Sequence, residues 1–458
     1  MSWLNEKTRE LLGRVDELKK ANAYPFFRPM ENVGSRVKVG TGSYVNFTSN
    51  DYLGLSRDPR VMRAGIRGIV QYGTGLGSAR PQATSVRHDE LEARLARWLG
   101  YPACVTFTTG YQSLVGTLSA FLDDDVTVVL DKLAHASIME GMLLARGEHP
   151  DLEVRYFKHN NMAHLRKCLE SAEHKNKMVV AEGYYSVDGD LGKIDEMVAL
   201  CRELDAVLMV DDAHGLGTLG ATGRGVGELF GVKDQIDILI GTFSKSFGGI
   251  GGFVCADRDI IDYMKLKARS FMFSASLPVA QVEAAMVALD IIENEPQHLQ
   301  RLRENGAYFR QGLTDLGFDL GDSVGHITPI MLRDQVLTLK FGAYLFYGGE
   351  IMMMPFISPG VPPGQERLRC NITAAHTRAQ MGYALEALAK VGEMLDVLPK
   401  GAKTKATNFQ RAYYFATHKL RGVRNAGLPF LTKQLAEAGE KASEWTRRRL
   451  GRNNHGSR

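Results

Sequence analysis

The stretch AVLMVDDAHGLG (residues 206–217) joins an apolar run to two aspartates and a glycine-rich turn. Four similar runs are CVTF (104–107), VTVVL (126–130), MVVAE (178–182) and DILIGTF (237–243). Helix-like periods lie between the runs, such as HDELEARLARWLG (88–100) and KIDEMVALCREL (193–204). Apolar strands that alternate with helices predict an α/β fold, with a mainly parallel sheet covered by helices on both faces.

Polar residues follow several of these runs, and ligands of such sheets bind beyond the carboxyl ends of the strands. The candidates at four strand ends are Gly110 and Tyr111; His135; Asp211 and His214; and Thr242, Ser244 and Lys245. A lysine flanked by hydroxyls and glycines suits an imine-forming nucleophile with a phosphate nearby. Backbone amides at a strand-to-helix turn favour an anion, and Asp211 is a candidate partner for a pyridinium nitrogen.

Each candidate taken alone has a simpler interpretation. A lysine in a glycine-rich loop is usually only solvated, and an Asp-x-x-His pair is more often a turn or a helix cap. A histidine beside an apolar strand is more often packed than catalytic. Their joint occurrence at four strand ends favours a lysine-dependent site on an α/β sheet.

Several long motifs give a more specific interpretation. They are NFTSNDYLGL (46–55), FTTGYQSL (107–114), DKLAHASIMEG (131–141), EGYYSVDGDLG (182–192), VDDAHGLGTLG (210–220), GTFSKSFGGIGGF (241–253), FSASLP (273–278) and LRCNITAAHT (368–377). Over about residues 20–396 the chain resembles the α-oxoamine synthase family of fold-type I pyridoxal-phosphate enzymes. The resemblance implies a seven-stranded, mainly parallel sheet flanked by helices, a smaller α+β C-terminal domain, and pyridoxal 5'-phosphate as the cofactor.

The resemblance also implies roles for single residues. Lys245 is expected to bind the cofactor and to remove the Cα proton of the amino acid. Asp211 is expected to pair with the ring nitrogen, His214 with the phenolic oxygen, and His135 to stack on the ring. The other implied contacts are Gly110, Tyr111, Thr242 and Ser244 at the phosphate, Ser186 near the cofactor, Ser274 or Ser276 from a second subunit, Arg369 at the amino-acid carboxylate, and Asn50 near the substrate. A homodimer with shared active sites follows, and no metal site is expected.

The implied reaction is a decarboxylative Claisen-type condensation of a small amino acid with an acyl thioester, as in sphingoid-base synthesis. The segment around Lys245 and LRCNITAAHT are most similar to bacterial serine palmitoyltransferase, whereas SPGVPPGQERLR (358–369) is more similar to 2-amino-3-ketobutyrate ligase. Two departures from the family pattern stand out. Ile357 replaces an arginine that serine palmitoyltransferase and 8-amino-7-oxononanoate synthase carry, and Ala83-Thr84 replaces a glycine-threonine pair.

These features favour L-serine and a long-chain acyl-CoA or acyl carrier protein as the substrates. Glycine or L-alanine with a different acyl thioester stays open, as in the aminoketobutyrate ligase or the oxononanoate synthase. An ordinary aminotransferase is disfavoured because the motif set is specific to the condensing family. A non-catalytic protein that binds pyridoxal phosphate is a remote alternative.

The chain divides by pattern into four segments: an N-terminal helix and arm (1–55), a large cofactor domain (56–295), a small C-terminal domain (296–398) and a basic helical extension (399–458). Residues 400–458 hold 14 basic and 3 acidic residues, a charge of +11, whereas the rest of the chain carries −7. Leu431, Leu435, Ala438, Ala442 and Trp445 fall along one helical face of the extension. It is expected to pack on the acidic body, or to bind an anionic membrane surface or an acyl carrier protein. A nucleic-acid role is disfavoured because no recognition motif accompanies the charge.

Composition and the lack of targeting signals predict the class of protein and its cellular location. The 458 residues are 44% hydrophobic and 24% charged, which excludes a disordered or fibrous class. No apolar run approaches the roughly 18 residues of a membrane span, and the charged N-terminus has no hydrophobic signal region. Five singly scattered cysteines and no C-x-x-C pair favour a reducing, cytoplasmic setting, with peripheral association at the inner membrane face through the tail as a further expectation.

Overall fold

The computed structural model describes residues 2–20, 22–399 and 401. The chain forms two compact units, one from Asn50 to Arg303 and the other from residues 1–49 together with the chain from Glu304 onward. The division falls inside helix α12 (Gln297–Leu316). The four segments expected from the sequence stay a prediction, and residues 402–458 of the basic extension lie outside the described residues.

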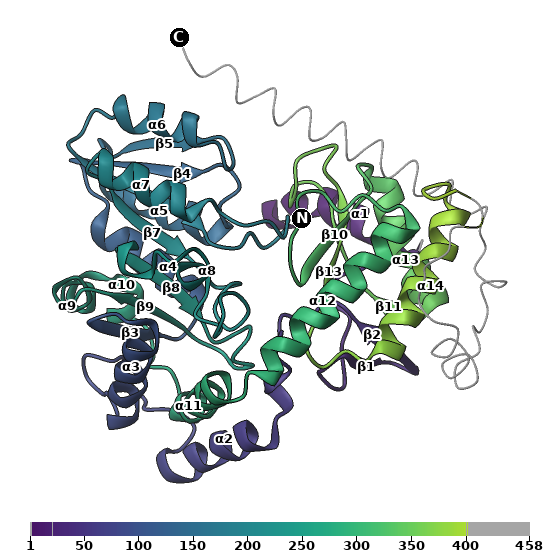
Figure 1. Cartoon of the computed structure of the whole chain (residues 1–458), viewed down its shortest axis with the longest axis horizontal. Coiled ribbons are helices and arrows are strands. Elements are labelled where there is room, and N and C mark those ends of the chain that lie inside the picture. The colour runs from purple at the N-terminus through teal and green to yellow at the C-terminus, as the bar shows by residue number, and fades with distance from the viewer. Residues whose placement is uncertain (1, 21, 400, 402–458) are drawn as a thin grey trace. The chain divides into compact units, whose positions relative to one another are not determined.

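The unit of residues 50–303 is built on a seven-stranded sheet (Figure 1). Its strands, in order across the sheet, are β3 (Ala103–Phe107), β9 (Gly252–Ala256), β8 (Ile238–Thr242), β7 (Val207–Asp211), β6 (Asn176–Glu182), β4 (Val126–Asp131) and β5 (Glu153–Phe157). Only β9 runs antiparallel to its neighbours in this sheet. The predicted seven-stranded, mainly parallel sheet is therefore confirmed.

Helices flank this sheet, as expected for strands that are apolar on both faces (Figure 1). They are α2 (Pro59–Tyr72), α3 (Val86–Leu99), α4 (Gly110–Phe121), α5 (Ala136–Glu148), α6 (Met162–Glu170), α7 (Ile194–Glu203), α8 (Val226–Phe230), α9 (Arg258–Lys267), α10 (Arg269–Met272) and α11 (Val279–Asn294), with 3-10 turns η1 (Leu55–Arg57) and η2 (Lys233–Gln235). Leu118 of α4 and Ile138 of α5 pack into one core with Val128 and Leu130 of β4, all four fully buried. This apolar burial fixes the helices that begin at the sheet edge.

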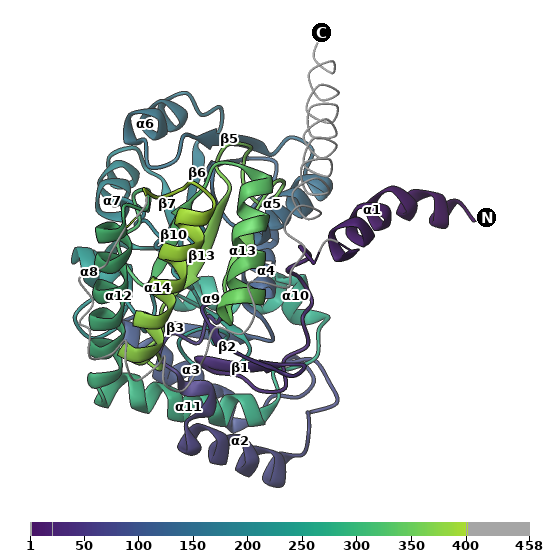
Figure 2. The same ribbon diagram turned by 90° about the vertical axis from the view of Figure 1, so that its right-hand side faces the viewer.

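The second unit contains the smaller α+β region that the sequence predicts, together with the N-terminal residues up to Ser49. Its elements are α1 (Trp3–Lys20), β1 (Arg36–Val39), β2 (Gly42–Asn46), the part of α12 from Glu304, β10 (Ile327–Met331), α13 (Gln335–Gly349), β11 (Ile351–Met352), β12 (Met354–Phe356), β13 (Arg367–Asn371) and α14 (Arg378–Met394). The strands form two three-stranded sheets, β1-β2-β11 and β10-β13-β12. Figure 2 shows α12, α13 and α14 beside β10 and β13, and Phe309, Phe341, Leu385 and Leu368 from these elements share one buried core. In the described part of the chain, no helix is both long and apolar enough to span a membrane.

Candidate active site

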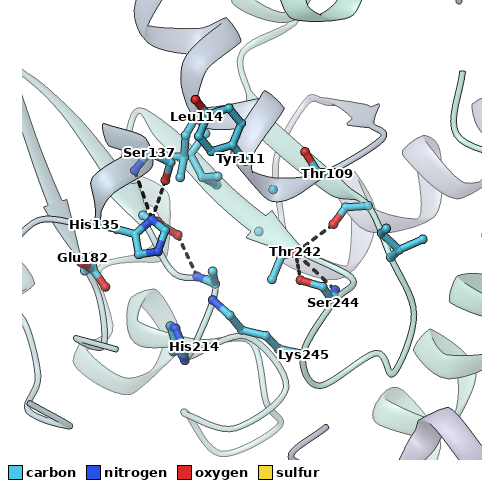
Figure 3. Close-up of a pocket in the computed structure, with 17 residues that line it drawn as sticks. Thr109, Tyr111, Leu114, His135, Ser137, Glu182, His214, Thr242, Ser244 and Lys245 are labelled. Carbon is cyan, nitrogen blue, oxygen red and sulfur yellow. Dashed lines mark hydrogen bonds between the residues drawn. The ribbon is translucent and has the colours of Figure 1, made fainter. Parts of the chain in front are cut away.

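A cavity of about 330 Å³ opens at the carboxyl ends of β7 and β8, within the unit of residues 50–303 (Figure 3). The structure brings together in its lining eight residues that the sequence predicts: Gly110, Tyr111, His135, Asp211, His214, Thr242, Ser244 and Lys245. The parallel strands explain this convergence, because their carboxyl ends meet at one edge of the sheet.

Lys245 lies in a loop that folds back on itself directly after β8. The amide of Phe243 donates to the carbonyl of Gly251 at 3.0 Å, and the amide of Gly249 donates to the carbonyl of Phe243 at 2.8 Å. Gly248 has a φ of 67°, and a Cβ there would meet the amide nitrogen of Ser56 at 2.3 Å, so the loop needs glycine at this position. The side chain of half-buried Lys245 extends into the cavity (Figure 3).

Two carboxylates lie side by side at the floor of the cavity. Asp211 ends β7 and pairs in register with Glu182, the last residue of β6. Asp211 is 5% exposed and Glu182 is 2% exposed, and both line the cavity. Burial and the neighbouring charge of Asp211 raise the pKa of Glu182 well above its ordinary value, although Lys245 acts in the opposite direction. Asp211 Oδ1 accepts the amide of Ala213 at 3.1 Å.

His214 is held by a phenol from the arm that precedes η1. The hydroxyl of Tyr52 lies 2.7 Å from His214 Nδ1, and the same hydroxyl donates to Asn50 Oδ1 at 3.2 Å. Tyr52 is fully buried and His214 is 5% exposed. The contact fixes the imidazole in the cavity wall and joins predicted Asn50 to the site through Tyr52.

His135 provides a flat ring at another wall of the cavity. It caps α5, where its Nδ1 accepts the amide of Ser137 at 3.3 Å and lies 2.6 Å from the Ser137 hydroxyl (Figure 3). Because Nδ1 accepts this amide, the single N–H proton of a neutral imidazole lies on Nε2. The cap sets the direction of the imidazole, which suits stacking on a planar cofactor.

The amino end of α4 supplies a cradle for an anion. The first amides of a helix have no acceptor within the helix. Here Thr109 Oγ1 accepts the amide of Gln112 at 3.1 Å, and the amides of Gly110 and Tyr111 come just before that amide in the chain. The hydroxyls of Thr242 and Ser244 lie 2.8 Å apart on the facing loop. A Cβ at Gly110 would lie 3.0 Å from Thr242 Oγ1, so the cradle is shaped by the absence of a side chain. Amides, hydroxyls and a helix dipole fit a phosphate, and the lysine and Asp211 fit the ring of pyridoxal phosphate.

Four other predicted residues lie outside this lining. The Ser186 amide donates to Glu182 Oε2 at 3.3 Å, and Ser274 Oγ accepts from Gln112 Nε2 at 2.8 Å. The Ser276 hydroxyl donates to the carbonyl of Ser78 at 2.9 Å. Arg369 belongs to β13 of the other unit, where its Nε donates to Asn371 Oδ1 at 2.9 Å and its guanidinium lies over the ring of Phe356. Their roles toward cofactor and substrate stay predictions.

Sequence reasoning missed Glu182 and Tyr52. Glu182 ends the apolar run MVVAE, and an acid at the end of a buried strand beside Asp211 was a usable signal. Tyr52 lies in the quoted motif NFTSNDYLGL, but nothing local in the sequence shows that it reaches His214, 162 residues away. Across the described residues, no group of three or more His, Cys, Asp or Glu could hold a metal ion.

The sequence matches the family of class I and II aminotransferases over residues 43–388. The chain belongs to this family. It is 38% identical to a serine palmitoyltransferase of Sphingobacterium spiritivorum over 386 residues, 84% of this chain and 95% of that protein. It is 39% identical to an 8-amino-7-oxononanoate synthase of Geobacter metallireducens over 392 residues, 84% of this chain and 99% of that protein.

Solved structures agree with these relatives. A serine palmitoyltransferase from S. paucimobilis, described with a PLP–myriocin aldimine, matches with a TM-score of 0.82 at 32% identity, over 87% of this chain and all of the other. An 8-amino-7-oxononanoate synthase from Francisella tularensis matches with a TM-score of 0.66 at 25% identity, over 77% of this chain and 98% of the other. The chain is thus an α-oxoamine synthase of fold-type I, as its motifs predict, and its cofactor is pyridoxal phosphate.

Proposed function

We propose that the protein condenses L-serine with a long-chain acyl thioester. A C–C bond forms between the serine Cα and the acyl carbon, the C–S bond breaks to free the thiol, and the serine carboxylate leaves as CO2. An α-amino ketone is the product. The observation that carries the proposal is that Lys245, Asp211, His214 and His135 line one cavity together with the amino end of α4.

Pyridoxal phosphate supplies an electron sink for the carbanion that forms at Cα. Asp211 would hold the proton on the ring nitrogen, because a buried carboxylate stabilises a neighbouring cation. His214, fixed by Tyr52, would form a hydrogen bond with the phenolic oxygen, and His135 would cover the ring face. Lys245 Nζ would bind the cofactor and then remove and return the Cα proton, a transfer that contributes about 10² to 10⁴-fold to a rate.

The preference for L-serine is supported by the motifs around Lys245 and by the similarity to serine palmitoyltransferases in sequence and fold. The alternative is glycine or L-alanine with a different acyl thioester. Ile357 replaces an arginine that both serine palmitoyltransferases and 8-amino-7-oxononanoate synthases carry, so it leaves the identity of the amino acid open. The equal sequence similarity to 8-amino-7-oxononanoate synthases supports the alternative. The acyl carrier is proposed to be CoA or acyl carrier protein.

The proposal also covers a second subunit, the residues that bind the amino acid, and the basic C-terminal residues. A homodimer is proposed to complete each site with Ser274 or Ser276 of a second copy, as the family resemblance implies. Arg369 is proposed to bind the amino-acid carboxylate, with Asn50 nearby. The basic residues 400–458, of which only residue 401 is described, are proposed to recruit an acyl carrier protein or an anionic membrane surface.

A substrate panel tests the proposal. The purified protein is titrated with L-serine, L-alanine and glycine while cofactor absorbance is recorded, and thiol release is then measured with acyl-CoA substrates of increasing chain length. L-Serine with a C14–C18 thioester is expected to give the highest kcat/KM, and Lys245→Ala to give none. Turnover with glycine or L-alanine but not L-serine overturns the serine assignment and favours the alternative.

A further inference from the structure

His159 bridges two buried aspartates beside the active site. It follows β5, and its side chain is 23% exposed. Its Nδ1 lies 3.1 Å from each carboxylate oxygen of Asp131, and its Nε2 lies 2.8 Å from Asp190 Oδ2. A neutral imidazole carries one N–H, so hydrogen bonds to two carboxylates require the doubly protonated ring. Burial opposes that charge, but the bonds to Asp131 and Asp190 outweigh it and raise the pKa of His159 to about 10.

Asp131 organises the loop that carries His135. It is the last residue of β4 and is fully buried. Its Oδ1 accepts the amide of Leu133 at 2.8 Å, and its carbonyl accepts the amide of Ala134 at 3.0 Å. The chain thus turns sharply between β4 and α5, and this turn delivers His135 to the cavity wall.

Asp190 closes the turn that carries Ser186. Its carbonyl accepts the amide of Tyr185 at 3.0 Å, and its Oδ2 also accepts Asn160 Nδ2 at 3.0 Å. The Ser186 amide reaches Glu182, which lines the cavity. The turn therefore connects to the carboxylate that lies beside Asp211.

Tyr185 fills the space between the two loops. Its ring is 1% exposed and meets the ring of His159 edge-on, with centroids 4.4 Å apart at 81°. The imidazole is therefore fixed by packing as well as by its two carboxylate partners. Asp131, Asp190 and Tyr185 are ionisable groups that contact this ring.

We infer that His159 is a positioning residue for the cofactor site, whose charged ring ties the loop of His135 to the turn of Ser186. The inference rests on the proposed roles of His135 and Ser186 toward pyridoxal phosphate. Asp131 and Asp190 lie 28 and 31 residues from His159 in sequence. Without the imidazolium, these two buried carboxylates lose their common partner. The two loops then separate, because a buried unpaired charge is costly.

The test compares His159→Gln with wild type as apoenzyme reconstituted with pyridoxal phosphate. Two readouts are the dissociation constant for the cofactor and the circular dichroism of the bound cofactor, which reports the ring's surroundings. We expect at least tenfold weaker binding and a reduced cofactor dichroism signal. His149→Gln is the matched control, since it removes an exposed histidine–carboxylate pair with Asp124 (Nδ1 to Oδ2, 3.2 Å) and is expected to change neither readout.

Binding within twofold of wild type with an unchanged dichroism signal overturns the inference. If His159→Gln does not fold, Asp190→Asn decides in the same way, because it keeps a similar shape and removes one carboxylate partner. Failure of the proposed function is distinguishable, since it shows in wild type: a protein that binds the cofactor but releases no thiol contradicts the reaction and leaves the His159 measurement valid.

Discussion

Two carboxylates on neighbouring strands, Asp211 and Glu182, set the electrostatics of the site at the scale of single residues. Their register places them side by side, and Lys245 lines the same cavity. Burial and the neighbouring Asp211 raise the pKa of Glu182 well above its ordinary value. A third acid, Asp212, is fully buried, and its Oδ2 accepts the amide of Val226 at 2.7 Å; it does not line the cavity. The two acids that line the cavity therefore come from two different motifs, and Asp212 stabilises the backbone behind it.

Asp211→Asn is expected to bind pyridoxal phosphate but to lose about 10² to 10⁴-fold in exchange of the serine Cα proton with solvent deuterium. The amide cannot hold the ring nitrogen protonated, so Cα acidity falls. Proton NMR of L-serine in D2O measures the exchange. Asp212→Asn is the control: burial raises the pKa of Asp212 to about 8, the residue does not line the cavity, and asparagine keeps its shape. Exchange at the wild-type rate in Asp211→Asn would show that Asp211 does not hold the ring nitrogen protonated.

The sequence predicts these residues unevenly, for physical reasons. Asp211, His214 and Lys245 each follow a fully apolar strand, and that local pattern reveals them. Tyr52, Glu182 and His159 act through partners that are distant in sequence, and only folding brings them together. No pattern within a short window shows that His159 reaches both Asp131 and Asp190.

At the scale of elements, the amino end of α4 and the start of β9 are packed without room for a side chain. A Cβ at Gly252 would lie 2.6 Å from Gly110 Cα and 2.7 Å from the Thr109 carbonyl oxygen. Backbone atoms of this kind cannot move aside as a flexible side chain can. The position of the phosphate cradle therefore depends on a glycine in the adjacent strand.

Gly252→Ala is expected to destabilise the protein by about 1 to 3 kcal/mol and to weaken cofactor binding, because α4 must shift. Urea denaturation and a cofactor titration measure the two effects. Gly147→Ala is the control within α5: a Cβ there meets nothing within 4 Å, and alanine favours a helix by about 1 kcal/mol. Equal cofactor affinity in Gly252→Ala and wild type would show that the cradle tolerates the shift.

The contacts of His159 predict how the stability of the protein depends on pH. The pKa of this imidazole is about 10 in the fold against an ordinary 6.5, so its stabilisation is complete below pH 6.5 and is lost as the pH rises to 10. Wild type is expected to exceed His159→Gln by about 3 kcal/mol in free energy of unfolding at pH 6, and the gap to shrink toward pH 10. Urea titrations of both apoproteins at several pH values measure it. A gap that stays constant or grows with pH would show that the ring is neutral in the fold.

The strands themselves were predictable to different degrees. The apolar runs at 104–107, 126–130 and 206–211 became β3, β4 and β7, because burial on both faces leaves a continuous apolar signature. Strand β5 (EVRYF) lies at the sheet edge, and its partly exposed, mixed sequence carries no such signature. Strand β9 follows a glycine-rich loop and begins within the motif that contains Lys245, so it was not predicted as a separate strand.

For the whole molecule, charge is divided between an acidic body of −7 and a basic stretch of +11 in residues 400–458. Removal of the residues after about 398 is expected to leave cofactor binding and turnover of short soluble thioesters unchanged. It is expected to weaken salt-sensitive binding to anionic vesicles or to acyl carrier protein, since such attraction is screened over about 10 Å at 0.1 M salt. Co-sedimentation at two salt concentrations measures this. Loss of the fold, or unchanged binding, would show that the tail does not recruit an anionic partner.

The central claim, decarboxylative condensation, is tested most directly by stoichiometry. The holoenzyme is incubated with carboxyl-labelled L-serine and palmitoyl-CoA, and labelled CO2 and free thiol are counted together. One CO2 per thiol is expected, both dependent on both substrates, with neither formed by Lys245→Ala. Transfer of the amino group to a 2-oxo acid without CO2, or thiol release that does not need an amino acid, would contradict the account.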